Sequence, residues 1–273
     1  MDAIKPGRWH HYKGNDYEVL YIARHSETLE PMVVYRALYG DGDVWVRPAS
    51  MWQEMVLSGG AHVPRFTYTG DSTITLRRET PDDYMACEHL TREAFWNLFK
   101  PGCDEHYLLH VMRRDASFIP ELDIVAEKDG AIAGHIAYTK SCVAAPHGGT
   151  LETITFGPLS VLPPLQRSGI GARLVLQTLA DARRAGYGAV IILGHPKYYP
   201  TFGFRCGRDF GLTLPDGTSP DALLALELQE GFLTRFGGGV YQYADVYHID
   251  TSSAEAFDRD FPYKEKKVTE TQL

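Results

Sequence analysis

Apolar and polar positions follow two different rhythms along this chain. In its first part, short runs rich in β-branched and aromatic residues alternate with polar residues, a pattern typical of half-buried strands. Runs at residues 17–23, 32–39 and 44–48 predict three strands, and a Gly-Asp-Gly-Asp stretch before the third predicts a hairpin turn. We therefore predict a small all-β domain over residues 1–70, a barrel or half-barrel capped by a short helix at residues 49–55.

The second part of the chain combines helical periodicity with longer apolar runs. Thr80-Pro81 marks the start of a helix, because a capping residue precedes proline at the first helical position. The order predicts an α/β (α+β) domain over residues 72–228, joined to the first near residues 69–72. The expected elements are a strand at 74–78, helices at 82–99 and 105–114, a hairpin at 123–127 and 131–140, a strand at 151–161, a helix at 170–185 and a strand at 189–193, followed by a short helix and a strand.

Residues 229–273 carry a mixed signal. Three consecutive glycines at 237–239 indicate a hinge or turn. The alternating aromatic residues at 240–247 predict a strand that adds to a sheet edge or covers a cleft. The charged residues at 264–267 indicate a solvated tail. We therefore predict a C-terminal extension with an added strand and a tail.

Composition and charge narrow the classes of protein that fit. Hydrophobic residues make up 44% and charged residues 23% of the 273 residues, which is ordinary for a globular protein and long enough for two domains. A formal net charge of −8 argues against nucleic-acid binding, because phosphate backbones select basic surfaces. No apolar run is long enough to span a bilayer, and the N-terminus lacks a signal-peptide core. We expect a cytoplasmic protein with no membrane partner.

Two groups of reactive side chains lack a catalytic arrangement. The four cysteines are scattered without a C-x-x-C pair, so we expect reduced thiols and no metal site. Residues 24–27 place an arginine, a histidine, a serine and a glutamate in succession. Adjacent residues of a strand point to opposite faces, so we interpret this stretch as a polar turn or a partner-binding edge.

Residues 159–172 carry most of the chemical information. Here a predicted strand passes through a glycine-rich turn into a helix. Gly169 and Gly171 let the backbone approach a ligand, and the N–H groups and dipole of the helix attract an anion. A Walker-type loop needs Gly-Lys-Ser/Thr, but Ala-Arg follows Gly171; a dinucleotide fingerprint needs a third glycine, but Gln166 takes its place. The loop predicts a pyrophosphate cradle, with an ordinary strand-turn-helix as the alternative.

The residues around this loop resemble a known superfamily. Gln/Arg-x-x-Gly-x-Gly/Ala after Leu-x-Val-x-Pro resembles the acyl-CoA-binding motif of the GNAT N-acyltransferases. Residues 194–204 resemble the GNAT segment Tyr-x-x-x-Gly-Phe and are similar to the YhbS-type branch of predicted acetyltransferases. The resemblance covers residues 74–228 and implies the GNAT fold, a central mixed, splayed β-sheet flanked by helices. Lys-Gly-x-x-Tyr-Glu-Val at residues 13–19 and Trp-x-Arg-Pro at 45–48 resemble the domain-of-unknown-function family 1653, which implies no activity.

The resemblance implies direct transfer of an acetyl group from acetyl-CoA to an amine in the same cleft. Backbone groups of Leu159, Ser160 and Val161 would pair with the pantetheine arm, and a strand N–H near Leu159 would stabilise the developing oxyanion. Arg167, either alone or together with Arg173, would add positive charge beside the pyrophosphate. The pyrophosphate itself would be held by backbone N–H groups of Gln166, Arg167, Ser168, Gly169, Ile170, Gly171 and Ala172.

Two tyrosines are candidates for the general acid. Tyr199 lies four residues before Gly203, the family's usual place for the tyrosine that protonates the departing thiolate. Tyr198 is the second candidate, and a packing role for both is the alternative.

The general base is less clearly marked. Some GNAT enzymes carry a carboxylate six residues before the motif valine, but that position is Thr155 here. Glu152 lies nine residues before Val161, so an unbulged strand would turn it to the opposite face. A bulge would bring Glu152 back, or water would carry the proton. We name Glu152 as the candidate base, with a solvated surface glutamate as the alternative.

Three functions fit these residues. The first is an acetyl-CoA-dependent N-acetyltransferase that acts on a primary amine of a small molecule or peptide by direct attack in a ternary complex. The second is a CoA-sensing or regulatory module, suggested by Thr155 and by the appended β domain, which would recruit a protein partner. The third is a CoA-independent nucleotide-binding protein. The acceptor stays open at this stage: Phe95, Trp96 and Phe99 either line a pocket or fill the core, and we favour the core.

Overall fold

The computed structural model describes residues 4–58, 61–70, 74–146, 148–269 and 272. The chain forms two compact units. One comprises Met1–Thr75 with Glu127–Ala131, and the other comprises Leu76–Ala126 with Ile132–Leu273. The expected join includes Asp71 and Ser72, which lie outside the described residues.

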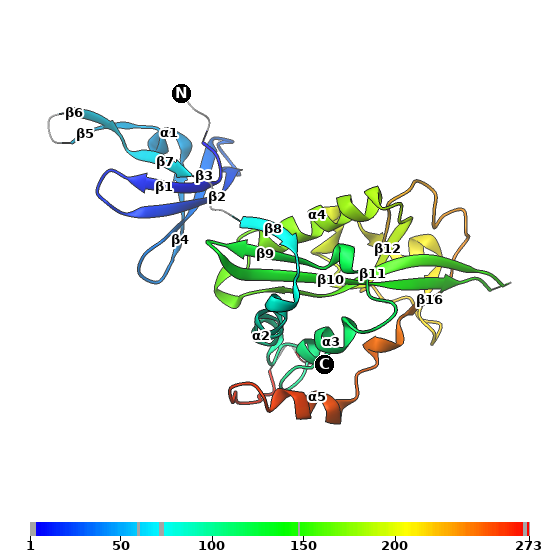
Figure 1. Cartoon of the computed structure of the whole chain (residues 1–273). Helices are drawn as coiled ribbons and strands as arrows, with labels where there is room; N and C mark the ends of the chain where they lie inside the picture. Colours follow the sequence, from blue (N-terminus) through cyan, green and yellow to red (C-terminus); the bar gives the residue numbers. More distant parts are fainter. Residues whose placement is uncertain (1–3, 59–60, 71–73, 147, 270–271, 273) are drawn as a thin grey trace. The chain divides into compact units, whose positions relative to one another are not determined.

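The N-terminal unit is built on a five-stranded antiparallel sheet in the order β4-β3-β2-β1-β7 (Figure 1). The three predicted strands are confirmed, whereas β1, β5, β6 and β7 were not predicted. The short helix α1 ends at Trp52 rather than at residue 55. The elements are β1 Gly7–His11, β2 Asp16–Arg24, β3 Pro31–Ala37, β4 Val44–Pro48, α1 Ala49–Trp52, the hairpin β5 Met55–Ser58 and β6 Ala61–Pro64, and β7 Phe66–Gly70.

Aromatic side chains form the core of this unit. Trp52 is fully buried and stacks on Phe66, with ring centroids 3.7 Å apart and an interplanar angle of 3°. Trp9 of β1 meets Trp52 edge-on at 5.8 Å. Aromatic pairs of this kind stabilise a small core beyond their buried area. Residues 24–27 form the end of β2 and a polar turn, in which His25 Nδ1 accepts hydrogen bonds from backbone N–H groups.

The second unit is built on a nine-stranded mixed sheet with helices on both faces, which confirms the predicted α+β class. The central strands run in the order β15-β12-β11-β10-β16, and β11 and β12 are parallel. The strands are β8 Ile74–Arg78, β9 Ile124–Lys128, β10 Ala131–Ala144, β11 Thr150–Val161, β12 Ala189–Leu193, β13 Arg205–Cys206, β14 Leu212–Thr213, β15 Leu223–Glu227 and β16 Gly239–Tyr243. The α-helices are α2 Tyr84–Phe95, α3 Glu105–Met112, α4 Ile170–Arg184 and α5 Thr251–Asp258. Short 3-10 turns are η1 Pro81–Asp83, η2 Pro120–Leu122, η3 Pro163–Leu165, η4 Tyr199–Phe202, η5 Gly207–Phe210 and η6 Asp245–Tyr247.

The two faces of this sheet are covered by different helices. Helix α4 lies on one face and helices α2 and α3 lie on the other (Figure 1). Tyr138 of β10 bonds Thr178 of α4 through their hydroxyls at 2.9 Å. Ser160 of β11 donates to Thr91 of α2 at 3.0 Å. These pairs show which side chains of the central strands face which helices.

The buried bond between Tyr138 and Thr178 gives a test of this packing. Thr178 Oγ1 donates to the carbonyl of Leu174, so the Tyr138 hydroxyl is the donor of the pair. We expect Tyr138→Phe to lower the free energy of unfolding by about 1 kcal/mol, because one buried hydrogen bond is lost without a cavity. Urea unfolding measures this difference. An unchanged midpoint and slope would contradict the assigned pairing.

Strands β11 and β12 diverge toward the glycine loop. Their described register contains the pair Ile154 and Val190, and beyond it the two strands separate around a cavity. This separation agrees with the splayed sheet that the family resemblance implied. It matters for function because a parallel pair that separates leaves strand N–H and C=O groups open to a ligand.

The C-terminal segment is part of the second unit. Strand β16 pairs with β10 along Ser141–Ala144. Helix α5 was not predicted; Asp250 caps it by accepting from the Ser253 N–H at 2.8 Å, and Asp258 at its end pairs with Arg92 of α2 at 2.6 Å. The interpretation of residues 264–267 as a solvated tail is wrong in part, because Lys264 pairs with Glu93 at 2.7 Å and the Glu265 carbonyl accepts from Trp96.

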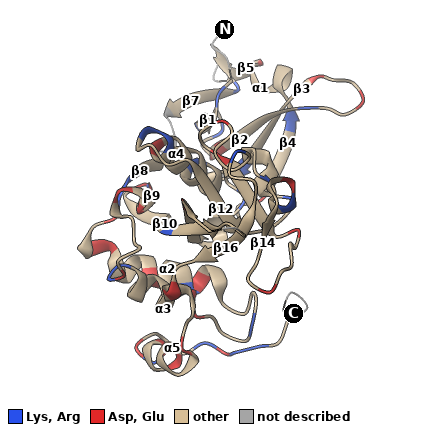
Figure 2. Cartoon of the chain, turned by 90° about the vertical axis from the view of Figure 1, so that its right-hand side faces the viewer, with Lys and Arg blue, Asp and Glu red and all other residues tan. Residues whose placement is uncertain are grey.

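Charged side chains of both signs are interspersed over the helices and loops (Figure 2). Among the helices that the structure describes, none is both long and apolar enough to cross a membrane. The cellular location stays a prediction.

Candidate functional site

A cavity of about 850 Å³ lies within the second unit, where β11 and β12 diverge. The residues that line the cavity come from both faces of the sheet. We call the part next to the glycine loop the donor half; it is lined by Leu159, Val161, Gln166, Gly171, Gly194, Tyr198 and Tyr199. We call the part next to α2 and α3 the acceptor half; it is lined by Phe95, Phe99, Glu105, Leu108, Thr155, Tyr241, Tyr243 and Tyr247.

The glycine loop is held in shape by its own side chains. The Gln166 amide donates to the Val161 carbonyl at 3.2 Å, and the Ser168 hydroxyl donates to the Leu165 carbonyl at 2.6 Å. Gly169 has φ +89°, a left-handed conformation that glycine adopts at little cost, and it is the N-cap of α4. The first N–H groups of α4 have no partner within the helix, so this end of the helix suits an anion.

Gly171 brings the loop close to Tyr198. A Cβ atom at residue 171 would lie 3.4 Å from the Tyr198 hydroxyl and 3.6 Å from Val161 Cγ2. The Tyr198 hydroxyl therefore lies directly beside the first turn of α4. Arg167 of the loop and Arg173 in the first turn of α4 are exposed.

The sequence-predicted donor residues fall into three groups. Leu159, Val161, Gln166 and Gly171 line the cavity. The Ser160 side chain turns to the α2 face and is fully buried, so only its backbone is available to a ligand there. The remaining predicted residues lie in the loop and the start of α4 but are not among the lining residues: Arg167, Ser168, Gly169, Ile170 and Ala172.

Tyr199 lines the donor half from η4. Its ring packs against Phe156 of β11 at 5.6 Å and against Phe204 at 5.8 Å. A Cβ atom at Gly194 would lie 2.4 Å from this ring, so glycine at that position makes room for it. Burial raises the pKa of the Tyr199 hydroxyl, and the nearby Tyr198 adds to the rise. Tyr199 therefore keeps its proton at neutral pH, as a general acid must.

A bulge in β11 changes the position of Glu152. Ile136 opposes Leu159 and Tyr138 opposes Phe156, so one residue of β10 faces two residues of β11 between these pairs. The bulge turns Glu152 to the same face as Leu159. Glu152 nevertheless lies four residues beyond Phe156, about 13 Å along a strand. It is exposed and is not among the lining residues.

The carboxylate that does line the cavity is Glu105, the first residue of α3. Burial raises its pKa to about 7; the carboxylate of Asp104 adds to the rise, while backbone N–H groups and Lys100 oppose it. A carboxylate with a pKa near 7 is suited to accept a proton at neutral pH. Sequence reasoning missed it, because an acidic residue in the first turn of a helix is usually explained by the helix dipole.

Aromatic residues at the end of α2 also reach the site. Phe95 and Phe99 line the cavity, so their interpretation as core residues is wrong. Trp96 does not line it; the Arg92 guanidinium lies 4.2 Å from its ring centroid. Thr155, in the place where a catalytic carboxylate was sought, is buried and lines the cavity together with Tyr241, whose hydroxyl donates to the Ile191 carbonyl at 3.1 Å.

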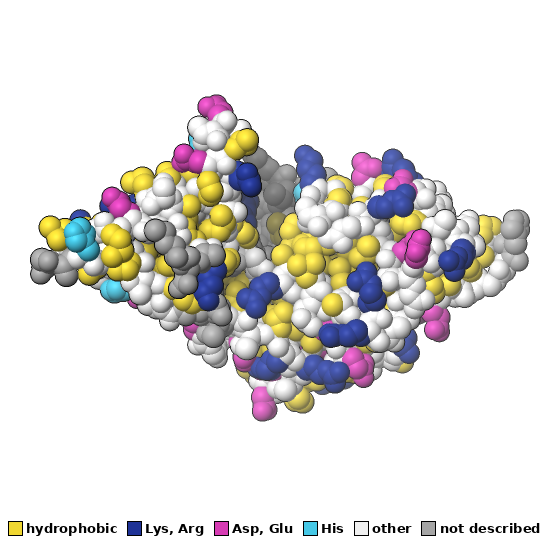
Figure 3. Space-filling model, turned by 90° about the horizontal axis from the view of Figure 1, so that it is seen from above, with side chains coloured by type: hydrophobic (Ala, Val, Ile, Leu, Met, Phe, Trp, Pro, Cys, Tyr) yellow, Lys and Arg dark blue, Asp and Glu magenta, His cyan; other side chains and the backbone are white. Residues whose placement is uncertain are grey.

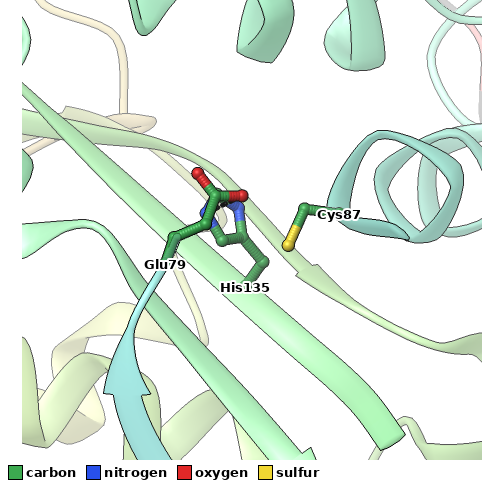
Figure 4. Close-up of side chains that lie close together, drawn as sticks. All are labelled: Glu79, Cys87 and His135. Atoms are coloured by element: carbon green, nitrogen blue, oxygen red, sulfur yellow. Dashed lines mark ion pairs between the residues drawn. The ribbon is translucent and has the colours of Figure 1, made fainter. Parts of the chain in front are cut away.

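A second cluster of polar side chains is buried under β10. Glu79, Cys87 and His135 bring possible metal ligand atoms within 4.8 Å of one another (Figure 4). The Glu79 carboxylate accepts from Nε and Nη2 of Arg113, at 2.8 and 2.6 Å, and His135 Nε2 lies 2.6 Å from Asp123.

These contacts favour an ion-pair network over a metal centre. A cation bound to Glu79 would lie against the Arg113 guanidinium, which repels it. Burial lowers the pKa of His135 to about 4, so its ring is neutral and donates through Nε2 to Asp123. Arg113 also pairs with Glu88 of α2 at 2.6 Å, so the network joins helices α2 and α3 to the sheet.

The N-terminal unit exposes apolar side chains (Figure 3, left). On the edge strand β4, Val44, Trp45 and Val46 are each more than half exposed, at 54, 53 and 58%. Exposed apolar residues on an edge strand are typical of an interaction surface.

Two segments of the chain match known protein families. Residues 7–68 match the family described as Protein of unknown function (DUF1653), and residues 87–204 match the Acetyltransferase (GNAT) family. The uncharacterized N-acetyltransferase YjhQ of Escherichia coli K12 is 34% identical over 109 residues, which are 40% of this chain and 60% of YjhQ. The uncharacterized N-acetyltransferase YhbS of the same strain is 29% identical over 130 residues, 48% of this chain and 72% of YhbS.

Two solved structures share the fold of the second unit. The GNAT family N-acetyltransferase YhbS from Escherichia coli, solved in complex with CoA, superposes with a TM-score of 0.59 at 24% identity, over 67% of this chain and 96% of that one. A GNAT family acetyltransferase from Brucella melitensis, in complex with acetyl-CoA, superposes with a TM-score of 0.51 at 26% identity, over 64% and 99% of the two chains.

Proposed function

The chain joins a DUF1653 domain to a domain of the GNAT acetyltransferase family, and from this premise we propose that it is an acetyl-CoA-dependent N-acetyltransferase acting on a primary amine. The observation that carries the proposal is the cavity, which has the glycine-rich start of α4 and Tyr199 on one side and the half-buried carboxylate of Glu105 on the other. The solved relatives named above hold CoA and acetyl-CoA.

The donor half fits the chemistry of CoA. The N–H groups at the start of α4 and the two exposed arginines, Arg167 and Arg173, would hold the pyrophosphate. The open edge of β11 at Leu159 and Val161 would pair with the amides of the pantetheine arm, and a strand N–H near Leu159 would stabilise the developing oxyanion. This arrangement leaves the thioester between Tyr199 and the acceptor half.

Amine attack on the thioester carbonyl in a ternary complex forms the C–N bond and breaks the C–S bond. An ammonium acceptor loses two protons overall. Glu105 takes the first, which makes the nitrogen nucleophilic, and passes it to solvent. The second ends on the sulfur of CoA through Tyr199, which donates its own proton to the departing thiolate and is reprotonated from the nitrogen. The products are the acetylated amine, CoA and one released proton.

The roles of the two tyrosines can be separated by matched variants. We expect Tyr199→Phe to lower kcat about tenfold, less than the roughly 10²–10⁴ typical of acid–base groups, because a thiolate leaves readily without full protonation. The Kd for acetyl-CoA should not change. Tyr198→Phe should instead weaken acetyl-CoA binding with little change in kcat, because the Tyr198 hydroxyl lies beside Gly171. Thiol release and calorimetric titration measure the two effects; a full kcat in Tyr199→Phe would remove it from the acid role.

A CoA-sensing module is the second candidate, favoured by Thr155 at the position where a carboxylate was expected. Tight CoA binding without thiol release across a broad panel of amines would support it over the transferase. Acetyl-CoA binding in either case would exclude a CoA-independent nucleotide-binding protein. A protein partner for the N-terminal unit stays a prediction, supported by the exposed apolar residues of β4.

A further inference from the structure

The acceptor half carries a single charge. Among the described residues that line the cavity, Glu105 is the one acid, and none is lysine or arginine. A buried carboxylate or phosphate on the acceptor would lack a cationic partner, and burying an unpaired charge is costly. An ammonium group has Glu105 as its partner. The single negative charge of Glu105 therefore favours an acceptor with one positive charge and no negative charge.

The rest of the acceptor half is apolar and aromatic. Tyr241 and Tyr243 from β16 and Tyr247 from η6 form one wall, with successive ring centroids 6.0 and 5.7 Å apart. The Tyr247 hydroxyl donates to the Gly157 carbonyl and accepts from Thr139, both at 3.3 Å. These bonds hold the ring against β10 and β11. Phe95 of α2 also lines this half. Aromatic walls attract an ammonium group and pack on a flat apolar body.

The space available limits the size of the acceptor. The cavity of about 850 Å³ has to contain the thioester end of the donor as well as the acceptor. Small-molecule sites commonly measure roughly 300–1,000 Å³, so a small acceptor fits the remainder.

We propose that the acceptor is a small primary amine with one positive charge, an aromatic body and no carboxylate or phosphate. This inference rests on the proposed transferase function. Its ammonium group pairs with Glu105, which removes one proton, and its ring lies against the tyrosines of β16 and η6. All three tyrosines follow residue 204, the end of the match to the acetyltransferase family, so the C-terminal segment sets the specificity of this chain.

The test uses the full chain, acetyl-CoA and four amines that differ in these features. They are 2-phenylethylamine, phenylalanine with its added carboxylate, the linear polyamine spermidine, and a short peptide with a free N-terminus. Thiol release gives kcat/KM, and mass spectrometry identifies the product. We expect 2-phenylethylamine to exceed each of the others by at least about tenfold, because they lack its aromatic body or add charges or polar groups that the wall does not pair.

Variants test whether the tyrosines of β16 and η6 cause the preference for 2-phenylethylamine. Tyr243→Ala should raise KM for 2-phenylethylamine by about tenfold without changing the Kd for acetyl-CoA. Tyr263→Ala is the matched control, since Tyr263 is 90% exposed and lies outside the cavity; it should behave as the parent. Faster transfer to phenylalanine, spermidine or the peptide would overturn the acceptor class and leave the transferase function standing. Acetyl-CoA binding without thiol release for any amine would overturn both.

Discussion

Replacing Gly171 by aspartate is expected to abolish acetyl-CoA binding at micromolar concentrations while the fold remains intact. The new carboxylate would lie in the first turn of α4, where the pyrophosphate is proposed to bind. Like charges about 5 Å apart repel by about 3 kcal/mol in an effective dielectric of about 20, which corresponds to a rise in Kd of roughly 100-fold. Isothermal titration with acetyl-CoA measures the loss.

The same substitution should not destabilise the protein, which makes the result specific. An acid near a helix N-terminus is favourable, and any residue other than proline is a better helix former than glycine. Gly171→Asn, of equal size and without charge, is the matched control. Its side chain fills the same space beside the loop, so it should weaken binding less than Gly171→Asp, and the difference in Kd between the two variants measures the effect of the charge. A parent-like Kd in Gly171→Asp would show that the pyrophosphate lies elsewhere.

Glu105→Gln is expected to lower kcat/KM by about 100-fold at pH 8, because the variant keeps the size of the side chain but cannot take a proton. The parent should also show a rising limb in kcat/KM with a pKa near 7, since burial raises the pKa of Glu105 to about 7 and the base must be ionised to act. Below that pH the free enzyme carries a protonated Glu105 and activity falls. The rising limb should disappear in the variant. Steady-state kinetics from pH 5.5 to 9 measure both effects.

Glu152→Gln is the matched control for this experiment. The substitution is the same, but Glu152 is exposed and lies outside the cavity, so kcat/KM should stay within about twofold of the parent. If Glu152→Gln lost activity while Glu105→Gln kept the kcat/KM of the parent, the general base would be Glu152 of β11 and not Glu105.

Elements with a strong internal period were predicted well. The amphipathic α4 and the continuous apolar run of β12 appear where the pattern placed them, because each carries its own repeat. Strand β1 and helix α5 were missed. Trp9 of β1 packs against residues that are distant in the sequence, Trp52 of α1 and Tyr68 of β7. Helix α5 depends on Asp258 pairing with Arg92, 166 residues away in the sequence.

The candidate site also contains residues that the sequence predicted and residues that it did not. The glycine loop and Tyr199 lie within continuous motifs, so their chemistry can be read from adjacent residues. Glu105 is far from both in the sequence, and its pKa depends on burial that only the packing of α3 creates. The bulge between Phe156 and Leu159 also reversed the face of Glu152, which strict alternation along the strand would have assigned wrongly.

The sequence by itself determined the family and the proposed donor site, because a strand, a turn and a helix start that are contiguous in the chain make a pyrophosphate cradle through backbone groups. Only the tertiary structure decided what the acceptor half looks like. Its wall combines α2, α3, β11 and the C-terminal tyrosines, which are distant in the sequence and meet only when β16 pairs with β10. A motif records local backbone geometry; the charge and shape of a cavity arise from side chains that folding brings together from several elements.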